Sequence, residues 1–390
     1  MYEFLIYAAL GMILLYDMKT ERIRNTKAER IIYAALVVFF VIRFSLGPDS
    51  GIYAQLFNRT VHPFQEAFTS HMSRNLLYTL LSFSAKKLFG EYRWLVFLQN
   101  VLILGGCSYV IFKYSKHKLL SLLLFIGGGM LEVFYGSGVR QGLAMTIFLV
   151  SFYQFLPKKQ YLFYMLGCLA AFGFQEIALI ALFVPFVYHF LGLFHKKPVK
   201  FIIVTTVISL LFFLVIRYFA RDFAYYITGK YGVAPVWTHV IAYLRFQQFS
   251  ILGFGMECVF GVGILLMYWL ADREKLDDFT VFSLLVFLFS VFIYIAFACY
   301  DIMSRVSDFI QIIMLILIPA LLDAIPKNKK LPVLSGIILL NGFLLYADVS
   351  ATVRRISGEF QREFTIQTYP YITVFDTERV NEYQVLLDRE

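Results

Sequence analysis

Two arginines stand at the ends of long apolar stretches, Arg140 within Gly138-Val139-Arg140-Gln141 and Arg305 within Ser304-Arg305-Val306. An ionisable group at membrane depth costs roughly 2.5–3.5 kcal/mol even on lenient insertion scales, so it usually faces a cavity and acts there. A guanidinium presents a planar fork of donors that fits phosphate and carboxylate groups. The two arginines therefore predict a buried anion site, with Arg245 as a third member.

Carboxylates at similar positions complete a candidate reaction centre. Asp49 follows one apolar stretch, and Glu176 lies beside Gln175 between two others. A carboxylate could take a proton from a hydroxyl while the arginines hold a phosphate-type anion. Further polar candidates at the same kind of position are Gln141, Asp301 and Asp308. The alternative, ordinary interface charges at helix ends, fits each residue singly but fits the whole set less well.

The elements that position these residues are apolar. The chain has 390 residues, of which 60% are hydrophobic and 16% charged, and apolar stretches recur from end to end. About 17–25 such residues span a bilayer as a helix. We expect an all-α polytopic membrane protein with about 12 transmembrane helices (range 11–14). The expected spans are 2–16, 30–46, 94–112, 119–135, 139–156, 161–174, 176–194, 199–219, 251–270, 279–299, 306–325 and 331–349. The stretch 75–89 contains Lys86 and Lys87 and is interpreted as re-entrant or interfacial.

The distribution of charge predicts an orientation. With twelve spans, every lysine-rich cluster falls on one side, which the positive-inside rule assigns to the cytoplasm. These clusters lie at 19–30, 113–118, 158–159, 196–200, 273–275 and 327–330. Most arginines fall on the other side or within spans, which points to anion chemistry at the external face. Residues 1–349 then form one polytopic transmembrane domain, and residues 350–390 form a polar external tail.

Several classes of function find no support in the sequence. There is no soluble catalytic domain and no P-loop, and Gly127-Gly128-Gly129 inside an apolar stretch indicates close helix packing. The histidines show no ligand spacing, so we expect neither a metal nor another cofactor, and no nucleic-acid partner. The four cysteines lie in apolar stretches and are interpreted as buried small hydrophobes. An aromatic loop at 220–250 offers Tyr231, Trp237 and Tyr243 for stacking on sugar rings, although an interfacial aromatic belt would look similar.

Four motifs, in the same order and spacing, give the chain a family resemblance. Gly47-Pro48-Asp49-Ser50-Gly51-Ile52-Tyr53, Val139-Arg140-Gln141-Gly142-Leu143-Ala144, Arg305-Val306-Ser307-Asp308-Phe309 and Tyr369-Pro370-Tyr371 carry it. They resemble the EpsG-like group of bacterial exopolysaccharide polymerases, whose role is related to that of the Wzy polymerases. The first motif adds Tyr53 to the candidate polar site. One position departs from the family: a histidine common in relatives is replaced here by Gln175, which cannot exchange a proton, so either Glu176 substitutes for it or the histidine is only a hydrogen-bond donor.

The resemblance implies a metal-independent glycosyltransferase. Such a polymerase joins oligosaccharide repeat units linked to undecaprenyl pyrophosphate at the outer face of the cytoplasmic membrane, for exopolysaccharide, capsule or O-antigen synthesis. Arg140, Arg305 and Arg245 would then bind pyrophosphate, and Asp49, ahead of Glu176, would be the base. Besides membrane lipid and the lipid-linked glycan, a chain-length regulator and a flippase are implied partners.

Two other functions stay open at this stage. A transporter or flippase for an anionic lipid-linked sugar would line a path with the arginines, but it favours charges at mid-span and repeated broken helices. Another membrane transferase, such as an acyltransferase that modifies the polysaccharide, normally uses a histidine centre, and the external face lacks a convincing one.

Overall fold

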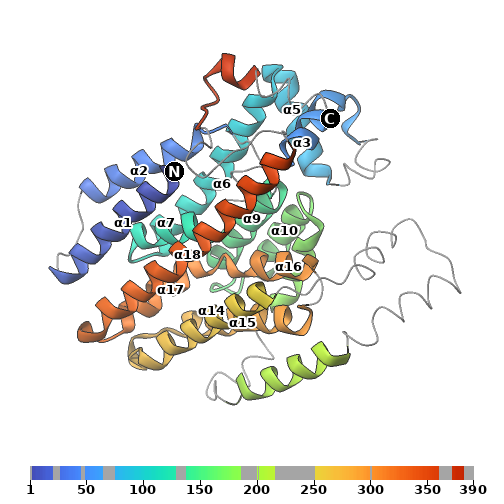
Figure 1. Ribbon diagram of the computed structural model, residues 1–390. Coiled ribbons are helices and arrows are strands. Elements are labelled where there is room, and N and C mark those ends of the chain that lie inside the picture. Colours follow the sequence, from blue (N-terminus) through green and yellow to red (C-terminus); the bar gives the residue numbers. More distant parts are fainter. Residues whose placement is uncertain are drawn as a thin grey trace, which may run out of the picture. The chain divides into compact units, whose positions relative to one another are not determined.

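A computed structural model (Figure 1) describes residues 2–20, 27–44, 49–64, 75–128, 138–185, 200, 202–215, 251–298, 301–359 and 371–381. The chain divides into two compact units, which are described separately. The first comprises Met1–Leu179 and Pro326–Glu390, and the second comprises Ile180–Ile325. Throughout the described residues the regular structure is helical, apart from one isolated β-bridge between Arg43 and Thr373. This confirms the expected all-α class.

The first unit is built from helices, the last of which comes from the end of the chain. They are α1 (Tyr2–Lys19), α2 (Lys27–Val41), α3 (Ser50–Arg59), α5 (Leu76–Phe89), α6 (Tyr92–Tyr114), α7 (Lys118–Gly127), α9 (Val139–Phe155), α10 (Tyr161–Phe172) and α18 (Lys327–Glu359). The last of these continues past residue 349, where the sequence suggested that the tail begins.

Helices α1 and α18 pack antiparallel. The hydroxyl of Tyr7 donates to the carbonyl of Ile338 over 2.7 Å, and Phe4 lies 6.3 Å from Tyr346, ring to ring. Because the two helices are antiparallel, the C-terminal end of α1, with Lys19, and the N-terminal end of α18, with the lysines at 327–330, lie at the same end of the unit.

Helices α6 and α9 run parallel: Cys107 of α6 contacts Thr146 of α9, and the C-terminal ends of the two helices meet. Lys113, at the end of α6, donates through Nζ to Oε1 of Gln154, at the end of α9, over 2.5 Å. The opposite end of α9 begins at Arg140. Asn100 on α6 donates to the carbonyls of Val41 (3.2 Å) and Arg43 (2.9 Å), which orients α2 antiparallel to α6. The lysines at the ends of α1, α6 and α18 therefore gather at one end of the unit, opposite Arg43 and Arg140, whereas Lys86 and Lys87 end α5 on the arginine side.

At the end of the unit that holds Arg43 and Arg140, α3 and α5 are short helices. Asp49 is the N-cap residue of α3, and Lys86 of α5 donates through Nζ to the carbonyls of Asn58 (2.6 Å) and Thr60 (3.2 Å). Gly90 has a φ of 79°, which a residue with a side chain adopts at a cost, and it turns the chain from α5 into α6. The 14 residues of α5 are about 21 Å long, too short to span a hydrocarbon core.

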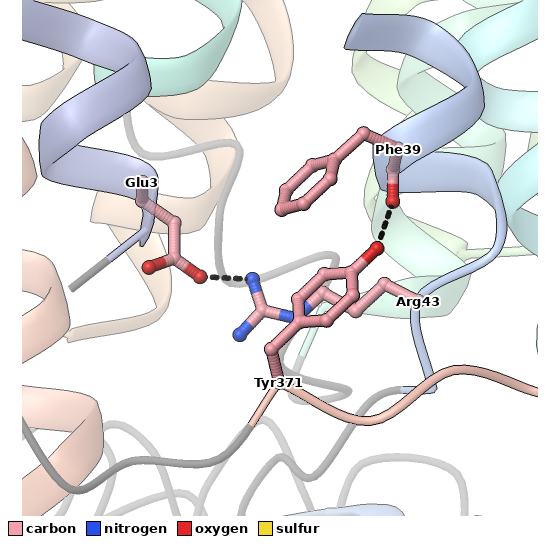
Figure 2. Close-up of polar contacts among 4 residues, drawn as sticks. All are labelled: Glu3, Phe39, Arg43 and Tyr371. Carbon is pink, nitrogen blue, oxygen red and sulfur yellow. Dashed lines mark hydrogen bonds and ion pairs between the residues drawn. The ribbon is translucent and has the colours of Figure 1, made fainter. Parts of the chain in front are cut away.

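A tail segment, residues 371–381, packs against the end of α2 (Figure 2). Its backbone pairs with residues 42–44: Phe44 donates to the carbonyl of Ile372 and Val374 to that of Ile42, each over 2.8 Å. Tyr371 stacks on Phe39 at 4.4 Å between ring centroids and donates to the Phe39 carbonyl over 2.6 Å. The segment is thus fixed by both backbone and side-chain contacts.

The tail segment covers a buried ion pair. Arg43 pairs with Glu3 of α1, and their side chains are 3% and 4% exposed. The guanidinium carbon of Arg43 lies 5.8 Å from the centroid of the Tyr371 ring. Residues from the beginning of α1, the end of α2 and the tail therefore form one tertiary contact.

The second unit contains the apolar helices α14 (Ile251–Leu270), α15 (Asp278–Ala296) and α17 (Met314–Ala324), the amphipathic helix α16 (Asp301–Gln311) and a further helix at Ile202–Val215. Asp277 caps α15 by accepting from the backbone N–H of Thr280 over 2.6 Å. Helices α16 and α17 are bent by 52° at their junction, where the sequence suggested one span at 306–325.

Four helices in the described part of the chain are long and apolar enough to cross a membrane: Tyr92–Tyr114, Gly253–Leu270, Asp278–Ala296 and Lys327–Arg354. The bent pair Arg305–Gln311 and Met314–Ala324 makes a fifth if counted as one. The expected count of about twelve is not reached within these residues. Several apolar stretches form shorter helices, such as α7 with 10 residues and α10 with 12, each well under the roughly 30 Å of a hydrocarbon core.

Candidate functional site

Arg140 contacts an aromatic residue of the first motif. Its Nε donates to the hydroxyl of Tyr53 over 3.3 Å, and its guanidinium carbon lies 5.6 Å from the centroid of the Tyr53 ring. Two of the four family-like motifs therefore meet in the fold. Among the described residues, the two terminal nitrogens of Arg140 make no hydrogen bond, so the outer edge of the fork is available to a ligand.

A second layer of polar side chains supports this contact. The ring of Tyr53 lies 5.5 Å from that of Tyr78 on α5, whose hydroxyl accepts a 3.0 Å hydrogen bond from Nε2 of Gln99 on α6. Tyr53, Tyr78 and Gln99 are all buried. Gln99 is two turns into α6, so the cluster is recessed by about 10 Å from the beginning of that helix. We call Arg140, Tyr53, Tyr78 and Gln99 the arginine cluster.

Asp49 lies near the arginine cluster. It is the N-cap residue of α3, but its side chain makes no capping hydrogen bond. The carboxylate is close enough to Arg140 for the two charges to interact. One turn further along α3, the N–H of Tyr53 donates to the Asp49 carbonyl over 3.0 Å, so the helix itself sets the spacing of the two residues. The structure thus associates a carboxylate with the cation.

Gln175 and Glu176 follow α10 at the same end of the unit. The carbonyl of Gly173 accepts from the backbone N–H of Leu77 over 2.9 Å, and Leu77 is adjacent to Tyr78 of the cluster. A side chain at Gly173 would collide with Leu77, so this close approach requires glycine. Gln175 is half-buried, whereas Glu176 is exposed at the start of a 3₁₀ helix (Glu176–Phe183). Half-buried Gln141 is next to Arg140 in the first turn of α9.

The third motif lies in the second unit and has two faces. Arg305 and Asp308 are exposed on one side of α16, as their spacing of three residues requires. Ser307 and Phe309 are fully buried, and Asp301 begins the helix. The proposed pairing of Arg305 with Arg140 joins two separately described units and stays a prediction.

The buried face of α16 meets a glutamate that sequence reasoning missed. Ser307 donates through its hydroxyl to Oε1 of Glu257 on α14 or to the carbonyl of Ser290, each at 3.1 Å. Gln311 donates through Nε2 to the same carboxylate oxygen and lies 2.8 Å from the Ser307 hydroxyl. An ionisable residue inside an apolar span was the available signal, since such residues are rare and usually functional.

A family model now gives these motifs their context. The model of the EpsG family matches residues 30–373, nearly the whole chain. The chain belongs to the EpsG family. The match includes α2 to α18 and reaches Thr373 in the tail segment, so the arginine cluster and the Ser307–Glu257 contact both lie within the EpsG region. No curated protein and no solved structure matches the chain. Membership of the EpsG family, together with the apolar helices, supports an integral membrane protein of polysaccharide biosynthesis with a polymerase-like activity.

Other predicted site residues fall outside the described part of the chain: Arg245, Tyr231, Trp237 and Tyr243. Among the residues that the structure describes, no group of three or more His, Cys, Asp or Glu side chains is arranged to hold a metal ion. Sequence reasoning named Arg140, Tyr53 and Asp49 but not Tyr78 or Gln99, although Gln99 and Asn100 form a polar pair inside an otherwise apolar stretch.

Proposed function

We propose that the chain is a glycosyltransferase that polymerises lipid-linked oligosaccharide repeat units. The observation that carries this proposal is Arg140: a cation recessed among apolar helices, oriented by Tyr53 and presenting its terminal nitrogens to a ligand. A pyrophosphate oxygen is the kind of acceptor that a guanidinium fork binds in two-point fashion. The substrate is undecaprenyl pyrophosphate carrying the glycan.

The proposed reaction is a single group transfer. The terminal hydroxyl oxygen of one glycan attacks the anomeric carbon of the other, and a new glycosidic bond forms. The bond from that carbon to the pyrophosphate oxygen breaks, and undecaprenyl pyrophosphate leaves with the electron pair. The hydroxyl proton passes to a carboxylate, for which Asp49 is favoured because it lies near Arg140, whereas Glu176 is exposed. Arg140 stabilises the charge that develops on the leaving group.

Asp49 has a second possible role. A carboxylate beside a guanidinium also orients it, and the base would then lie elsewhere or be unnecessary. Comparing Asp49→Asn with Glu176→Gln and Gln175→His separates these roles. A wild-type rate in Asp49→Asn removes Asp49 as the base, and a faster rate in Gln175→His assigns a chemical role to the histidine found in relatives.

The orientation of the reaction follows from the lysines. In the first unit the lysine-bearing ends of α1, α6 and α18 lie together, opposite the arginine cluster, and only α5 ends in lysines on the other side; the positive-inside rule assigns the larger group to the cytoplasm. We therefore propose that Arg140 acts at the external face of the cytoplasmic membrane, where a flippase delivers the substrate and a chain-length regulator acts on the product. Labelling of a cysteine introduced at Lys159 by an impermeant reagent from outside intact cells would contradict this orientation.

The deciding experiment uses purified protein and lipid-linked repeat units. We expect a ladder of glycans that differ by one repeat unit, and its absence with chemically intact substrate refutes the polymerase. Arg140→Lys should abolish most of the ladder, whereas Arg354→Lys, an exposed arginine on α18, should not.

One observation favours transport as the second candidate. The bend between α16 and α17 follows Gln311, which contacts the membrane-embedded Glu257, and broken helices with polar partners recur in transporters. Movement of a labelled lipid-linked glycan across proteoliposomes, without growth of the glycan, would establish that function instead.

A further inference from the structure

A polar pocket of about 290 Å³ lies beside the arginine cluster in the first unit. Its polar lining comes from Asn58 on α3, Glu91 before α6, and Thr377 and Asn381 of the tail segment. The pocket is near the lower limit of the roughly 300–1,000 Å³ typical of small-molecule sites. Its walls therefore derive from three parts of the chain that are far apart in sequence.

The pocket is built by specific contacts. Arg93 pairs through Nε with Oε2 of Glu91 at 2.7 Å and donates through Nη1 to the hydroxyl of Thr377 at 2.5 Å, so it joins α6 to the tail segment. Lys86 fixes the end of α3 by binding the Asn58 carbonyl. Gly90, in its left-handed conformation, lines the pocket at the turn between α5 and α6.

Its chemistry selects a neutral polar ligand. The side-chain amides of Asn58 and Asn381 make no hydrogen bond to any described residue, so each offers both a donor and an acceptor. Arg93 contacts both carboxylate oxygens of Glu91, so the two charges offset each other, and the polar lining disfavours a lipid chain. Amide, hydroxyl and carboxylate groups around a small pocket are suited to the hydroxyls of a sugar.

Three aromatic residues that do not line the pocket lie within three residues of its lining in the sequence. The ring of Trp94 lies 6.0 Å from that of Phe375 in the tail segment and 5.9 Å from that of Phe89. Phe375 is 59% exposed and Phe89 50%. Exposed aromatic faces beside hydrogen-bonding groups allow the apolar face of a sugar ring to pack while its hydroxyls are satisfied.

The pocket and the arginine cluster share a wall. Ala54, which follows Tyr53 on α3, lines the pocket, and Asn58 lies about one turn further along the same helix. Tyr92 lines the pocket and is close enough to Tyr53 and Tyr78 of the cluster for electrostatic interaction. The pocket and the arginine cluster are therefore both built on α3.

We propose that this pocket is the glycan subsite, which binds a sugar of the lipid-linked repeat unit whose phosphate contacts Arg140. The proposal rests on the proposed polymerase function and adds the position of the carbohydrate. The predicted sugar contacts in loop 220–250 lie outside the described residues and stay a separate prediction.

Two measurements test the subsite. The first is saturation-transfer NMR of the full chain in nanodiscs with lipid-free oligosaccharide cleaved from the polysaccharide of the producing cells. The second is the KM for the lipid-linked repeat unit in the ladder assay. The variants are Asn58→Ala and Asn381→Ala, both exposed side chains, and the control is Glu378→Ala, an exposed tail residue that does not line the pocket.

We expect each asparagine variant to lose about 2- to 10-fold in oligosaccharide affinity and to raise KM similarly, which is the usual contribution of one hydrogen bond. The kcat should stay near wild type, and Glu378→Ala should match wild type in both assays. Affinity and KM unchanged in both variants would overturn the subsite. If wild-type protein makes no ladder but binds oligosaccharide in a way that depends on Asn58, the polymerase fails and the glycan subsite stands.

Discussion

The ion pair between Glu3 and Arg43 is expected to hold the tail segment in place, and Glu3→Gln tests this. Both side chains are almost completely buried, under the ring of Tyr371. The substitution keeps the size and an acceptor oxygen but removes the negative charge, so the Arg43 guanidinium is left in a dry site without its counter-charge. The Arg43 guanidinium can regain hydration if the tail segment, which covers it, is released.

The magnitude follows from the burial. Breaking a buried pair by neutralising one partner costs about 3–5 kcal/mol, and we expect the lower limit because the glutamine carbonyl still accepts a hydrogen bond. If the cost acts on tail release, the opening equilibrium rises by about 100-fold or more. Arg43→Met combined with Glu3→Gln should recover most of the loss, since replacing both partners is often neutral.

Hydrogen exchange of the backbone amides gives the readout. Val374 and Phe44 donate across the contact between the tail and α2, so their N–H groups exchange only when this contact opens. We expect both amides to exchange about 100-fold faster in Glu3→Gln and near the wild-type rate in the double variant and in Glu378→Gln, an exposed control. Exchange within about 3-fold of wild type in Glu3→Gln would refute the reasoning, because that corresponds to under 1 kcal/mol.

Three further outcomes are expected. Tyr53→Phe removes the acceptor that orients Arg140, so it should lower kcat in the ladder assay by about 10-fold, the value of a hydrogen bond to a charged group; an unchanged kcat would separate this tyrosine from the reaction. Glu257→Gln should melt near wild type, because an amide oxygen still accepts from Ser307, whereas Glu257→Leu should lose about 1–3 kcal/mol; equal melting of the two variants would exclude these hydrogen bonds as the cause. Burial raises the pKa of Tyr371 from 10.0 to about 12. Since the folded value is the higher one, its stabilising contribution is complete below pH 10 and lost as pH rises through 12, so the phenolate absorbance that Tyr371→Phe removes should titrate near pH 12 and not near 10.

The sequence was informative wherever a residue type was out of place in its local surroundings. Arg140 beside an apolar stretch signalled a functional cation, and the structure places it against Tyr53 of a separate motif. Gly127 was interpreted as a close-packing residue, and a side chain there would collide with Asn341 of α18. These inferences need only the local pattern and the cost of burying charge.

Contacts between distant segments could not be predicted in the same way. Glu257 and Ser307 are separated by 50 residues, and the pairing of residues 42–44 with the tail segment joins chain positions more than 300 apart. The expected number of spans was too high for the described residues for another reason. Hydropathy is averaged over a window, so it does not show that α7 ends at Gly127 after 10 residues. The pocket lined by Asn58 and Asn381 was missed because each residue by itself looks like ordinary polar surface.

The discontinuity of the first unit has a consequence for biosynthesis. Residues 326–381, which supply α18 and the tail segment, leave the ribosome after the whole of the second unit. Until then the faces of α1 and α7 that α18 covers have no partner, and Arg43 lacks the ring of Tyr371 above it. Domains that fold during synthesis usually do so in order from the N-terminus, but here the earlier unit can close only after the later one has been made. A nonsense mutation near residue 325 of the 390 should therefore produce chains that contain about five-sixths of the sequence, yet that quality-control proteases remove as unassembled.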